Sequence, residues 1–331
     1  MIFFKVWKFF LSLLLGLLLV VSVAASTIVQ TSLPATGCVG ASCRPFDYIV
    51  TILMENNGYC DVVTTCRGSG TYETSLAQSY AVAGQCTSDS NCASGGYTAL
   101  FHPSEPNYIA LVAGSNFGII EDNVCCYTIN HQNLIDKLQT NGITWDAYAE
   151  DATGSGTCNF MPPSSPNHFG FLEFKDNNVT LRCAHFLTTT SPTLPSGPVN
   201  DHEFLAELNS SNTSHYIWLT PNYSDDGHDT GVTGADAYLS NLVPKILNSN
   251  LFSTQRAALF IVYDEGPTNY VFPNDYVYAS WVGPTVKQHY TGTGSYSHFS
   301  YLATLENNWG FTCLVIGNDC SAAPMTEFFV S

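Results

Sequence analysis

Polar and acidic residues follow three apolar runs of this chain, at the points where the runs end. They are Glu55 and Asn56 after residues 46–54, Asn222, Asp225, Asp226, His228 and Asp229 after residues 216–220, and Asp264 and Glu265 after residues 257–263. The runs have the apolar, β-branched character of buried strands in a parallel sheet. Sites in such sheets form in the crevice outside the carboxyl ends of the strands. Oxygen donors that meet there can bind a divalent cation.

Two interpretations of these strand ends are open. An acidic residue after a strand is often only a turn former or a helix cap. Glu55 and Asp264, however, directly follow apolar runs. Carboxylates at a buried edge need a cation or hydrogen-bond donors to offset their lost hydration. The residue types therefore favour one shared site over three unrelated turns.

A serine stands at the expected start of a helix, in the stretch His102-Pro-Ser-Glu-Pro-Asn-Tyr108. Ser104 as N-cap and Pro106 near the first helical position predict a helix that runs to residue 113. The N-terminus of a helix favours an anionic phosphoryl group. A serine oxygen that also binds a metal can attack phosphorus. In the alternative interpretation, Ser104 is only a helix cap.

Two histidines stand near these features. His228 lies between Asp226 and Asp229, and His298 ends the stretch Tyr296-Ser-His298. A histidine titrates near neutral pH, so each could bind a metal, contact phosphate or protonate a leaving group. The alternative for each is a structural hydrogen bond. Three further histidines are weaker candidates, namely His102, His168 and His185.

The alternation of strand and helix patterns predicts an α/β fold with a largely parallel sheet. Strands are expected at residues 46–54, 143–149, 216–220, 257–263 and 276–282, and helices near 73–83 and at 106–113, 133–140, 235–247 and 298–309. Residues 58–98 are rich in Gly, Ser, Thr and Cys and are predicted to be mostly loop. No linker divides the chain, so one large domain with loop insertions is expected.

The first residues predict export. Lys5 and Lys8 precede an apolar run over residues 9–23, and small residues follow at 24–26. This pattern is typical of a cleaved signal peptide over residues 1–26, which leaves a domain at 27–331. If the segment stays uncleaved, it anchors the protein in a membrane. In both cases the domain is secreted or lies at the cell surface.

Charge and cysteine content agree with an extracellular protein. Without Lys5 and Lys8, 8 basic residues face 27 acidic ones, a formal charge of −19. We therefore do not expect the protein to bind nucleic acid through a basic surface, and the composition favours an acidic environment. All 12 cysteines follow the signal segment, which indicates disulfides. Short-range pairs are expected for Cys38–Cys43, Cys60–Cys66, Cys86–Cys92 and Cys313–Cys320. Cys158–Cys183 is expected as a longer crosslink, with different partners for Cys125 and Cys126.

Four sequons predict a glycoprotein. Their asparagines are Asn178, Asn209, Asn212 and Asn222. The first three lie in polar, loop-like sequence. Asn222 lies beside the candidate site, so we expect it to stay unmodified.

Six stretches of the sequence, taken in order, carry a family resemblance. They are Glu55-Asn-Asn57, His102 to Gly114, Trp145 to Asp151, Thr220 to Asp229, Tyr263-Asp-Glu-Gly266 and Tyr296-Ser-His298. Together they resemble the phosphoesterase family of secreted acid phosphatases and non-specific phospholipases C, within the alkaline phosphatase superfamily. The resemblance covers the chain from about Phe46 to about Gly310, and it implies an alkaline-phosphatase-like fold.

The resemblance implies a role for each matching residue. Ser104 would be the nucleophile, with His228 and His298 near the phosphate or a second metal position. The substrate would be contacted by Asn56, Asn107 and Asp229. A divalent metal ion (Zn, Mg, Ca or Mn) would be bound by Glu55, Asn56, Asp226, Asp264 and Glu265.

The function predicted from these features is hydrolysis of a small phosphate monoester by a secreted, metal-dependent acid phosphatase. Phospholipases of the family usually carry Arg-Ser-Phe-Asp after Glu-Asn, whereas this chain has Asn57-Gly-Tyr-Cys60. Two alternatives remain. One is a phosphodiesterase or phospholipase C that uses the same site. The other is a non-catalytic cell-surface binding protein whose acidic clusters hold Ca²⁺ for stability.

Overall fold

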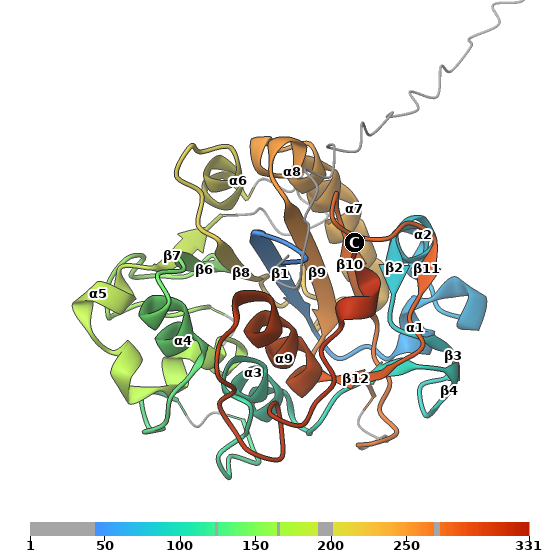
Figure 1. Cartoon of the computed structure of the whole chain (residues 1–331), viewed down its shortest axis with the longest axis horizontal. Helices are drawn as coiled ribbons and strands as arrows, with labels where there is room; N and C mark the ends of the chain where they lie inside the picture. Colours follow the sequence, from blue (N-terminus) through green and yellow to red (C-terminus); the bar gives the residue numbers. More distant parts are fainter. Residues whose placement is uncertain (1–43, 123–124, 164–165, 191–200, 268–271, 331) are drawn as a thin grey trace, which may run out of the picture. The chain divides into compact units, whose positions relative to one another are not determined.

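The computed structural model describes residues 44–122, 125–163, 166–190, 201–267 and 272–330 (Figure 1). In this part of the chain, eight strands form one sheet in the order β11-β2-β10-β9-β1-β8-β6-β7. Its parallel strands are β1 (Tyr48–Met54), β6 (Trp145–Glu150), β7 (Phe186–Thr189), β8 (Tyr216–Thr220) and β9 (Ala257–Tyr263). β1 lies between β8 and β9, so the three apolar runs of the sequence are neighbours in the sheet.

The other edge of the sheet is mixed. β10 (Ala279–Val282) runs antiparallel to β9 and to β2 (Ala81–Val82), and β11 (Tyr290–Thr291) pairs in parallel with β2. Two small ladders lie outside the sheet, one of β5 (Gly96–Thr98) with β12 (Ser295–Ser297) and one of β3 (Gln85–Ser88) with β4 (Asn91–Ser94). The sheet is therefore mostly parallel, as predicted.

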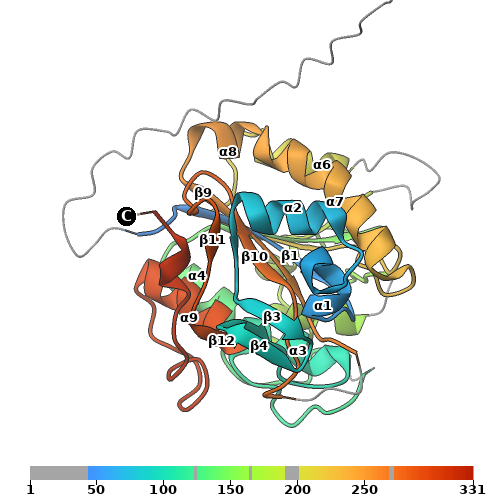
Figure 2. The same cartoon turned by 90° about the vertical axis from the view of Figure 1, so that its right-hand side faces the viewer.

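Helices cover both faces of the sheet (Figures 1 and 2). One face carries α2 (Thr71–Ser79), α6 (His202–Leu208), α7 (Gly231–Leu247) and α8 (Asn250–Thr254). The opposite face carries α3 (Ser104–Ala113), α4 (Leu134–Thr140) and α9 (His298–Trp309). Short α-helices lie at α1 (Tyr59–Val62) and α5 (Thr180–Cys183), and 3₁₀ turns at Thr64–Cys66, Pro166–His168, Gly170–Glu173, Lys175–Asn177 and Thr326–Phe328. This arrangement confirms the predicted α/β fold.

The central strands are buried on both faces because helices cover both. Every residue of β9 is buried, and so are the six residues of β1 after Tyr48. Aromatic rings join the layers, since Phe260 of β9 stacks on Tyr301 of α9 with ring centroids 5.1 Å apart. Continuous apolar runs suit such strands, which explains why the sequence pattern located β1, β8 and β9.

α3 begins one residue earlier than the sequence predicted. Pro103 is the N-cap and Ser104 is the first helical residue, so the prediction of Ser104 as N-cap was wrong. The helix ends at Gly114, which has a φ of +74° in the left-handed region that glycine adopts without strain. All ten residues of α3 are buried. The helix therefore fixes Ser104 firmly beneath the ends of the strands.

The segment predicted as mostly loop, residues 58–98, contains regular structure. It forms α1, α2 and the four short strands β2 to β5. Disulfides Cys60–Cys66 and Cys86–Cys92 connect parts of it. α2 corresponds to the helix predicted near residues 73–83. The other elements are too short to show a periodic pattern, so the sequence contained little sign of them.

The described disulfides confirm four of the expected pairs and correct another expectation. Cys60–Cys66, Cys86–Cys92, Cys158–Cys183 and Cys313–Cys320 pair as predicted. Cys125 and Cys126 are bonded to each other, so the prediction of different partners was wrong. Cys38, Cys43 and the predicted signal peptide lie outside the described residues. Within the described residues, no helix has both the length and the apolar character needed to cross a bilayer.

Candidate active site

The ends of β1, β8 and β9 are joined by backbone hydrogen bonds. The amide of Glu55 donates to the carbonyl of Asp226 (2.9 Å), and the amide of Asp264 donates to the carbonyl of Met54 (2.9 Å). The amide of Asn56 donates to Oδ1 of Asp264 (3.0 Å). The structure therefore brings together Glu55, Asn56, Asp226 and Asp264, which sequence analysis placed at three separate strand ends.

Ser104 reaches this junction from the start of α3. Its Oγ donates a hydrogen bond to Oε2 of Glu55 (3.0 Å). Both side chains are buried, with exposed fractions of 4% and 0%. The serine hydroxyl thus lies against a carboxylate and at a helix N-terminus, where an anion is favoured.

Three buried carboxylates, those of Glu55, Asp226 and Asp264, form what we call the Glu55 cluster. Among the described residues, each has one oxygen without a hydrogen-bond partner, namely Oε1 of Glu55, Oδ2 of Asp226 and Oδ2 of Asp264. Burial, together with repulsion between the carboxylates, raises the pKa of all three. Anions buried this closely need a cation or protons.

The strand ends supply oxygen donors of the type that divalent cations bind. Unpartnered carboxylate oxygens come from all three ends, and Ser104 adds a hydroxyl oxygen. Asn56 has a φ of +58°, a left-handed conformation that asparagine tolerates better than most residues. A set of oxygen ligands suits hard or borderline divalent cations.

Glu265 belongs to a neighbouring network. His102 bridges two carboxylates, with Nδ1 2.9 Å from Oε2 of Glu265 and Nε2 2.9 Å from Oδ2 of Asp275. Burial opposes a charge on His102, but hydrogen bonds to Asp275 and Glu265 prevail and raise its pKa to about 10. His102 is therefore the cation of this network. Sequence analysis treated His102 as a weaker candidate, although it lies only two positions before Ser104.

Asn107 supports the same network. Its Oδ1 accepts hydrogen bonds from the amides of Leu100 and Phe101, and its Nδ2 donates to the carbonyl of Phe101 (2.8 Å). A longer contact of 3.4 Å joins Nδ2 to Oε2 of Glu265. The side chain holds the turn before α3 and contacts Glu265, and its predicted contact with substrate remains a prediction.

His228 and Asp229 lie at the rim of the site. The amide of His228 donates to Oδ1 of Asp226 (2.7 Å), and its ring Nδ1 lies 2.8 Å from Oδ1 of Asp229. Both side chains are partly exposed, 38% for His228 and 59% for Asp229. Solvent and substrate can therefore reach this pair, unlike the buried carboxylates.

His298 lies beneath the site instead of on its surface. Its ring is fully buried, with Nε2 2.6 Å from the carbonyl oxygen of Asp264 and Nδ1 3.1 Å from the hydroxyl of Tyr97. Burial lowers its pKa to about 4, so the ring is neutral at working pH. With both nitrogens engaged, His298 is placed to position the Asp264 backbone; its predicted catalytic role stays a prediction.

His168 is a site residue that sequence analysis ranked too low. Its Nδ1 lies 3.6 Å from Oε1 of Glu55, and its ring stacks on Tyr108 with centroids 5.2 Å apart. Burial, and then the neighbouring His228, lower its pKa to about 3. His168 follows no strand in the sequence, so only the folding of its loop brings it to Glu55.

Asn222 and Asp225 leave the candidate site and join a second acidic group. Glu150 and Asp201 share a hydrogen bond there, and with Asp225 they form what we call the Glu150 cluster. Asn222 donates its amide to Oε2 of Glu150 (2.8 Å) and its Nδ2 to Oδ2 of Asp225 (3.4 Å). Of the polar residues after β8, Asp226 is the one whose carboxylate joins the Glu55 cluster.

Asp122 accepts a hydrogen bond from a backbone amide beside Ser104, the candidate nucleophile. Its Oδ1 accepts a hydrogen bond from the amide of Glu105 (3.0 Å), in the first turn of α3. This amide follows Ser104 directly and is one of the groups that an anion at the helix N-terminus would use. The sequence contained no sign of this contact.

Fold and site together define a class, the α/β proteins with a cluster of polar and acidic residues at the carboxyl edge of a mostly parallel sheet. The chain belongs to the phosphoesterase family, because the sequence model of that family matches residues 71–312. This finding confirms the resemblance seen in the sequence.

Relatives of known name agree with this family. A phosphate-repressible acid phosphatase of Penicillium chrysogenum is 31% identical over 223 residues, which cover 66% of this chain and 52% of that protein. A phosphatidylinositol-3-phosphatase of Mycobacterium tuberculosis is 25% identical over 319 residues, which cover 94% and 93% of the two chains. The chain spans about half the length of the fungal and yeast acid phosphatases it matches.

Solved structures agree with the fold. A protein in the alkaline phosphatase superfamily from Vibrio parahaemolyticus superposes with a TM-score of 0.52 at 13% identity, over 82% of this chain and 69% of that one. At this identity the likeness supports the fold alone.

Proposed function

We propose that this chain is a metal-dependent phosphomonoesterase of the acid phosphatase type, with Ser104 as nucleophile. The observation that carries the proposal is the position of Ser104 Oγ. It lies at the N-terminus of α3, 3.0 Å from Oε2 of Glu55, beside three buried carboxylate oxygens without partners. The names of the relatives, acid phosphatases and a phosphatidylinositol-3-phosphatase, support this substrate class.

In the first step, Oγ of Ser104 forms a bond to phosphorus while the bond to the leaving alcohol breaks. Glu55 accepts the hydrogen bond of the hydroxyl and is placed to receive its proton. In the second step, water attacks phosphorus and Ser104 is released.

A divalent metal would be held by Glu55, Asn56, Asp226 and Asp264, with Ser104 beside it. When bound, it supplies Lewis-acid stabilisation of the phosphoryl oxygens and lowers the pKa of the serine hydroxyl. Glu265 is placed to support this set through His102 and Asn107. With 8 basic residues after the signal segment, the chain offers few side-chain cations for the same purpose.

The leaving alcohol needs a proton. His228 is the better placed of the two predicted histidines because its side chain is partly exposed at the rim. Asp229 engages Nδ1 of His228 and leaves Nε2 for proton transfer. His298, which is buried and neutral, is assigned to positioning the Asp264 backbone.

We also propose that the protein is exported and glycosylated. Five disulfides among the described residues suit an oxidising compartment. Asn178, Asn209 and Asn212 are exposed, so an oligosaccharide would fit there. Asn222 is buried and bonded to the Glu150 cluster, which supports the expectation that this sequon is not used.

Replacing Ser104 with alanine tests the mechanism. We expect hydrolysis of an aryl phosphate to fall by at least about 10³-fold, as for the loss of other enzymic nucleophiles. Ser249→Ala is a matched control, since Ser249 is also buried at a helix start but caps α8 away from the site. The control should lose about 1 kcal/mol of stability and keep its turnover.

Turnover by Ser104→Ala close to that of the wild type would refute Ser104 as the nucleophile. Assays of the wild type on a phosphate diester separate the monoesterase from the diesterase alternative. If the wild-type protein, loaded with each of Zn²⁺, Mg²⁺, Ca²⁺ and Mn²⁺, hydrolyses neither ester, the non-catalytic alternative is favoured.

A further inference from the structure

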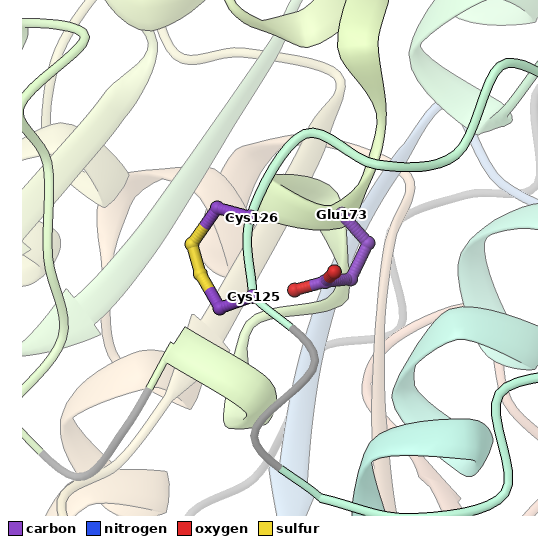
Figure 3. A group of neighbouring side chains, drawn as sticks. All are labelled: Cys125, Cys126 and Glu173. Atoms are coloured by element: carbon purple, nitrogen blue, oxygen red, sulfur yellow. A yellow bond between two sulfur atoms is a disulfide. The ribbon is translucent and has the colours of Figure 1, made fainter.

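Two sulfurs and a carboxylate lie together away from the strand ends (Figure 3). One donor atom each of Cys125, Cys126 and Glu173 lies within 4.8 Å of the other two. The cysteines are half-buried and form a disulfide with each other. We call these three residues the Cys125 group. Nothing in the proposed phosphatase chemistry uses it.

Backbone pairing holds the Cys125 group in place. The amide of Tyr127 donates to the carbonyl of Leu172 (2.7 Å), and the amide of Ile129 donates to the carbonyl of Glu173 (2.9 Å). These bonds fix the chain after the cysteines alongside the chain that carries the carboxylate. The three side chains would therefore stay close if the disulfide opened.

Glu173 is the unusual member of the group. Its side chain is fully buried, and within the described residues neither carboxylate oxygen has a hydrogen-bond partner. In Figure 3 the Glu173 carboxylate points toward the backbone of the two cysteines, and their sulfur atoms lie on the far side of that backbone in this view. A buried carboxylate without donors is costly unless a cation or a proton compensates it. Burial, with a smaller contribution from Glu105, raises its pKa to about 8.

A second group in the chain has the same donor types and serves as a comparison. Cys313, Cys320 and Asp319 also lie within 4.8 Å of one another. Asp319, however, accepts hydrogen bonds from the amides of Leu314 (2.6 Å) and Val315 (3.0 Å). Its carboxylate is committed to the loop, so this group has a structural explanation that the Cys125 group lacks.

The short span of the Cys125–Cys126 disulfide also argues against a purely structural role. It joins residues one position apart, whereas Cys158–Cys183 spans 25 positions. In the chain-entropy account, a crosslink stabilises the fold mainly by restricting the unfolded chain, and more so for longer loops. A crosslink between adjacent residues restricts almost nothing beyond their own backbone.

We propose that the Cys125 group is a thiol-gated site for a thiophilic divalent cation, represented by Zn²⁺. An external dithiol supplies two electrons and two protons, the bond between the two sulfurs breaks, and the dithiol becomes a disulfide. Zn²⁺ then displaces the two thiol protons and is bound by two thiolates and the Glu173 carboxylate. Two thiolates, one carboxylate and a water match the four ligands that zinc prefers.

The test measures zinc content as a function of the redox state of the full protein. The protein is treated with increasing dithiothreitol, dialysed anaerobically against Zn²⁺, and analysed for zinc per chain, while alkylation and mass spectrometry identify the open cysteines. We expect one additional zinc per chain when Cys125 and Cys126 open. Zinc bound at the Glu55 cluster is present in both the oxidised and the reduced protein, so it does not change the difference in zinc content between them.

Two variants separate the Cys125 group from other sources of zinc. Glu173→Gln keeps the shape of the side chain and both cysteines, and should weaken the additional site by at least about tenfold, the lower range for loss of a supporting residue. Cys313→Ser combined with Cys320→Ser should leave the additional zinc unchanged.

Three outcomes would overturn the proposal. The first is no additional zinc in the reduced wild type. The second is unchanged zinc affinity in Glu173→Gln. The third is a Cys125–Cys126 bond that stays closed at dithiothreitol concentrations that open Cys313–Cys320. None of these outcomes bears on Ser104, so the phosphatase proposal is tested separately.

Discussion

Two acidic clusters lie at the same edge of the sheet, and they differ in how their charge is balanced. In the Glu150 cluster, Glu150 shares a hydrogen bond with Asp201, Tyr238 donates to Asp201 (3.2 Å), and Asn222 donates to Glu150 (2.8 Å). In the Glu55 cluster, the Ser104 hydroxyl donates to Glu55, the amide of Asn56 donates to Asp264, and the amide of His228 donates to Asp226.

The comparison shows that carboxylates at strand ends do not by themselves make a metal site. The Glu150 cluster has side-chain amide and phenol donors and a shared proton, so it is balanced from within. The Glu55 cluster also has donors, including the hydroxyl of Tyr108 beside Glu55, and both clusters keep carboxylate oxygens without a donor among the described residues. A cation from outside is the natural counterpart for the Glu55 cluster, because Ser104 at the N-terminus of α3 lies beside it.

The largest expected effect compares one substitution in each cluster. Asp264→Asn should lose bound metal and reduce turnover of an aryl phosphate by at least about 100-fold, since even second-shell partners of metals are worth about 10–100-fold. Asp201→Asn should keep metal and turnover while its unfolding free energy changes by about 1–3 kcal/mol. Metal analysis, kinetics and calorimetry measure these three quantities. Equal loss of metal in both variants would show that the two clusters do not differ in metal binding.

A smaller effect is expected in the pH dependence of stability. Burial raises the pKa of Glu150, with Asp201 adding to it, and burial raises the pKa of Asp201 to about 6. Because the folded state binds these protons more tightly, their contribution is complete below about pH 4, near the ordinary carboxyl pKa, and is lost as pH rises through 6 and above. Glu150→Gln keeps a neutral donor toward Asp201. The variant should therefore lose less thermal stability than the wild type between pH 5 and pH 8.

Calorimetry on both proteins tests this prediction. In a chain of this size, each kcal/mol of unfolding free energy shifts the melting temperature by roughly 2–4 °C. Identical slopes of melting temperature against pH would mean that the Glu150 proton makes no contribution. The difference between the proteins is the informative quantity, because the other titrating groups are the same in both.

The smallest expected effect concerns Asp122, which holds the Glu105 amide beside Ser104. Removing its charge should favour an anion at the N-terminus of α3. Inorganic phosphate should inhibit Asp122→Asn about 2- to 5-fold more strongly, which corresponds to about 0.3–1 kcal/mol for one charge at a helix end. Glu121→Gln, an exposed neighbour, is the matched control. The same inhibition constant in Asp122→Asn and the control would show that this amide does not contact phosphate.

The sequence predicted those parts of the site that depend on continuous local patterns. β1, β8 and β9 are apolar runs buried on both faces, and Glu55 and Asp264 follow two of them directly. Ser104 was recognisable from the helix that follows it. For these residues the position along the chain determines the position in space, because a parallel sheet aligns the ends of its strands.

Other features depend on long-range packing that leaves no local pattern. His168 reaches Glu55 through an irregular loop, and Asn222 turns toward Glu150 although Asp226, four positions later, joins the Glu55 cluster. Pairing of Cys125 with Cys126 also contradicted the expectation from spacing. In each case the partner is selected by the fold, and several partners are equally compatible with the sequence.

The position of β1 between β8 and β9 has a consequence for how the protein is made. Asn56 and Asp264 contact each other across 208 positions of the chain, so the ribosome must release most of the protein before these proposed metal ligands can meet. Closing so long a loop is slow relative to local helix formation. Hydrolytic activity can therefore appear only after β9 has docked beside β1, and its time course during refolding would report that last pairing.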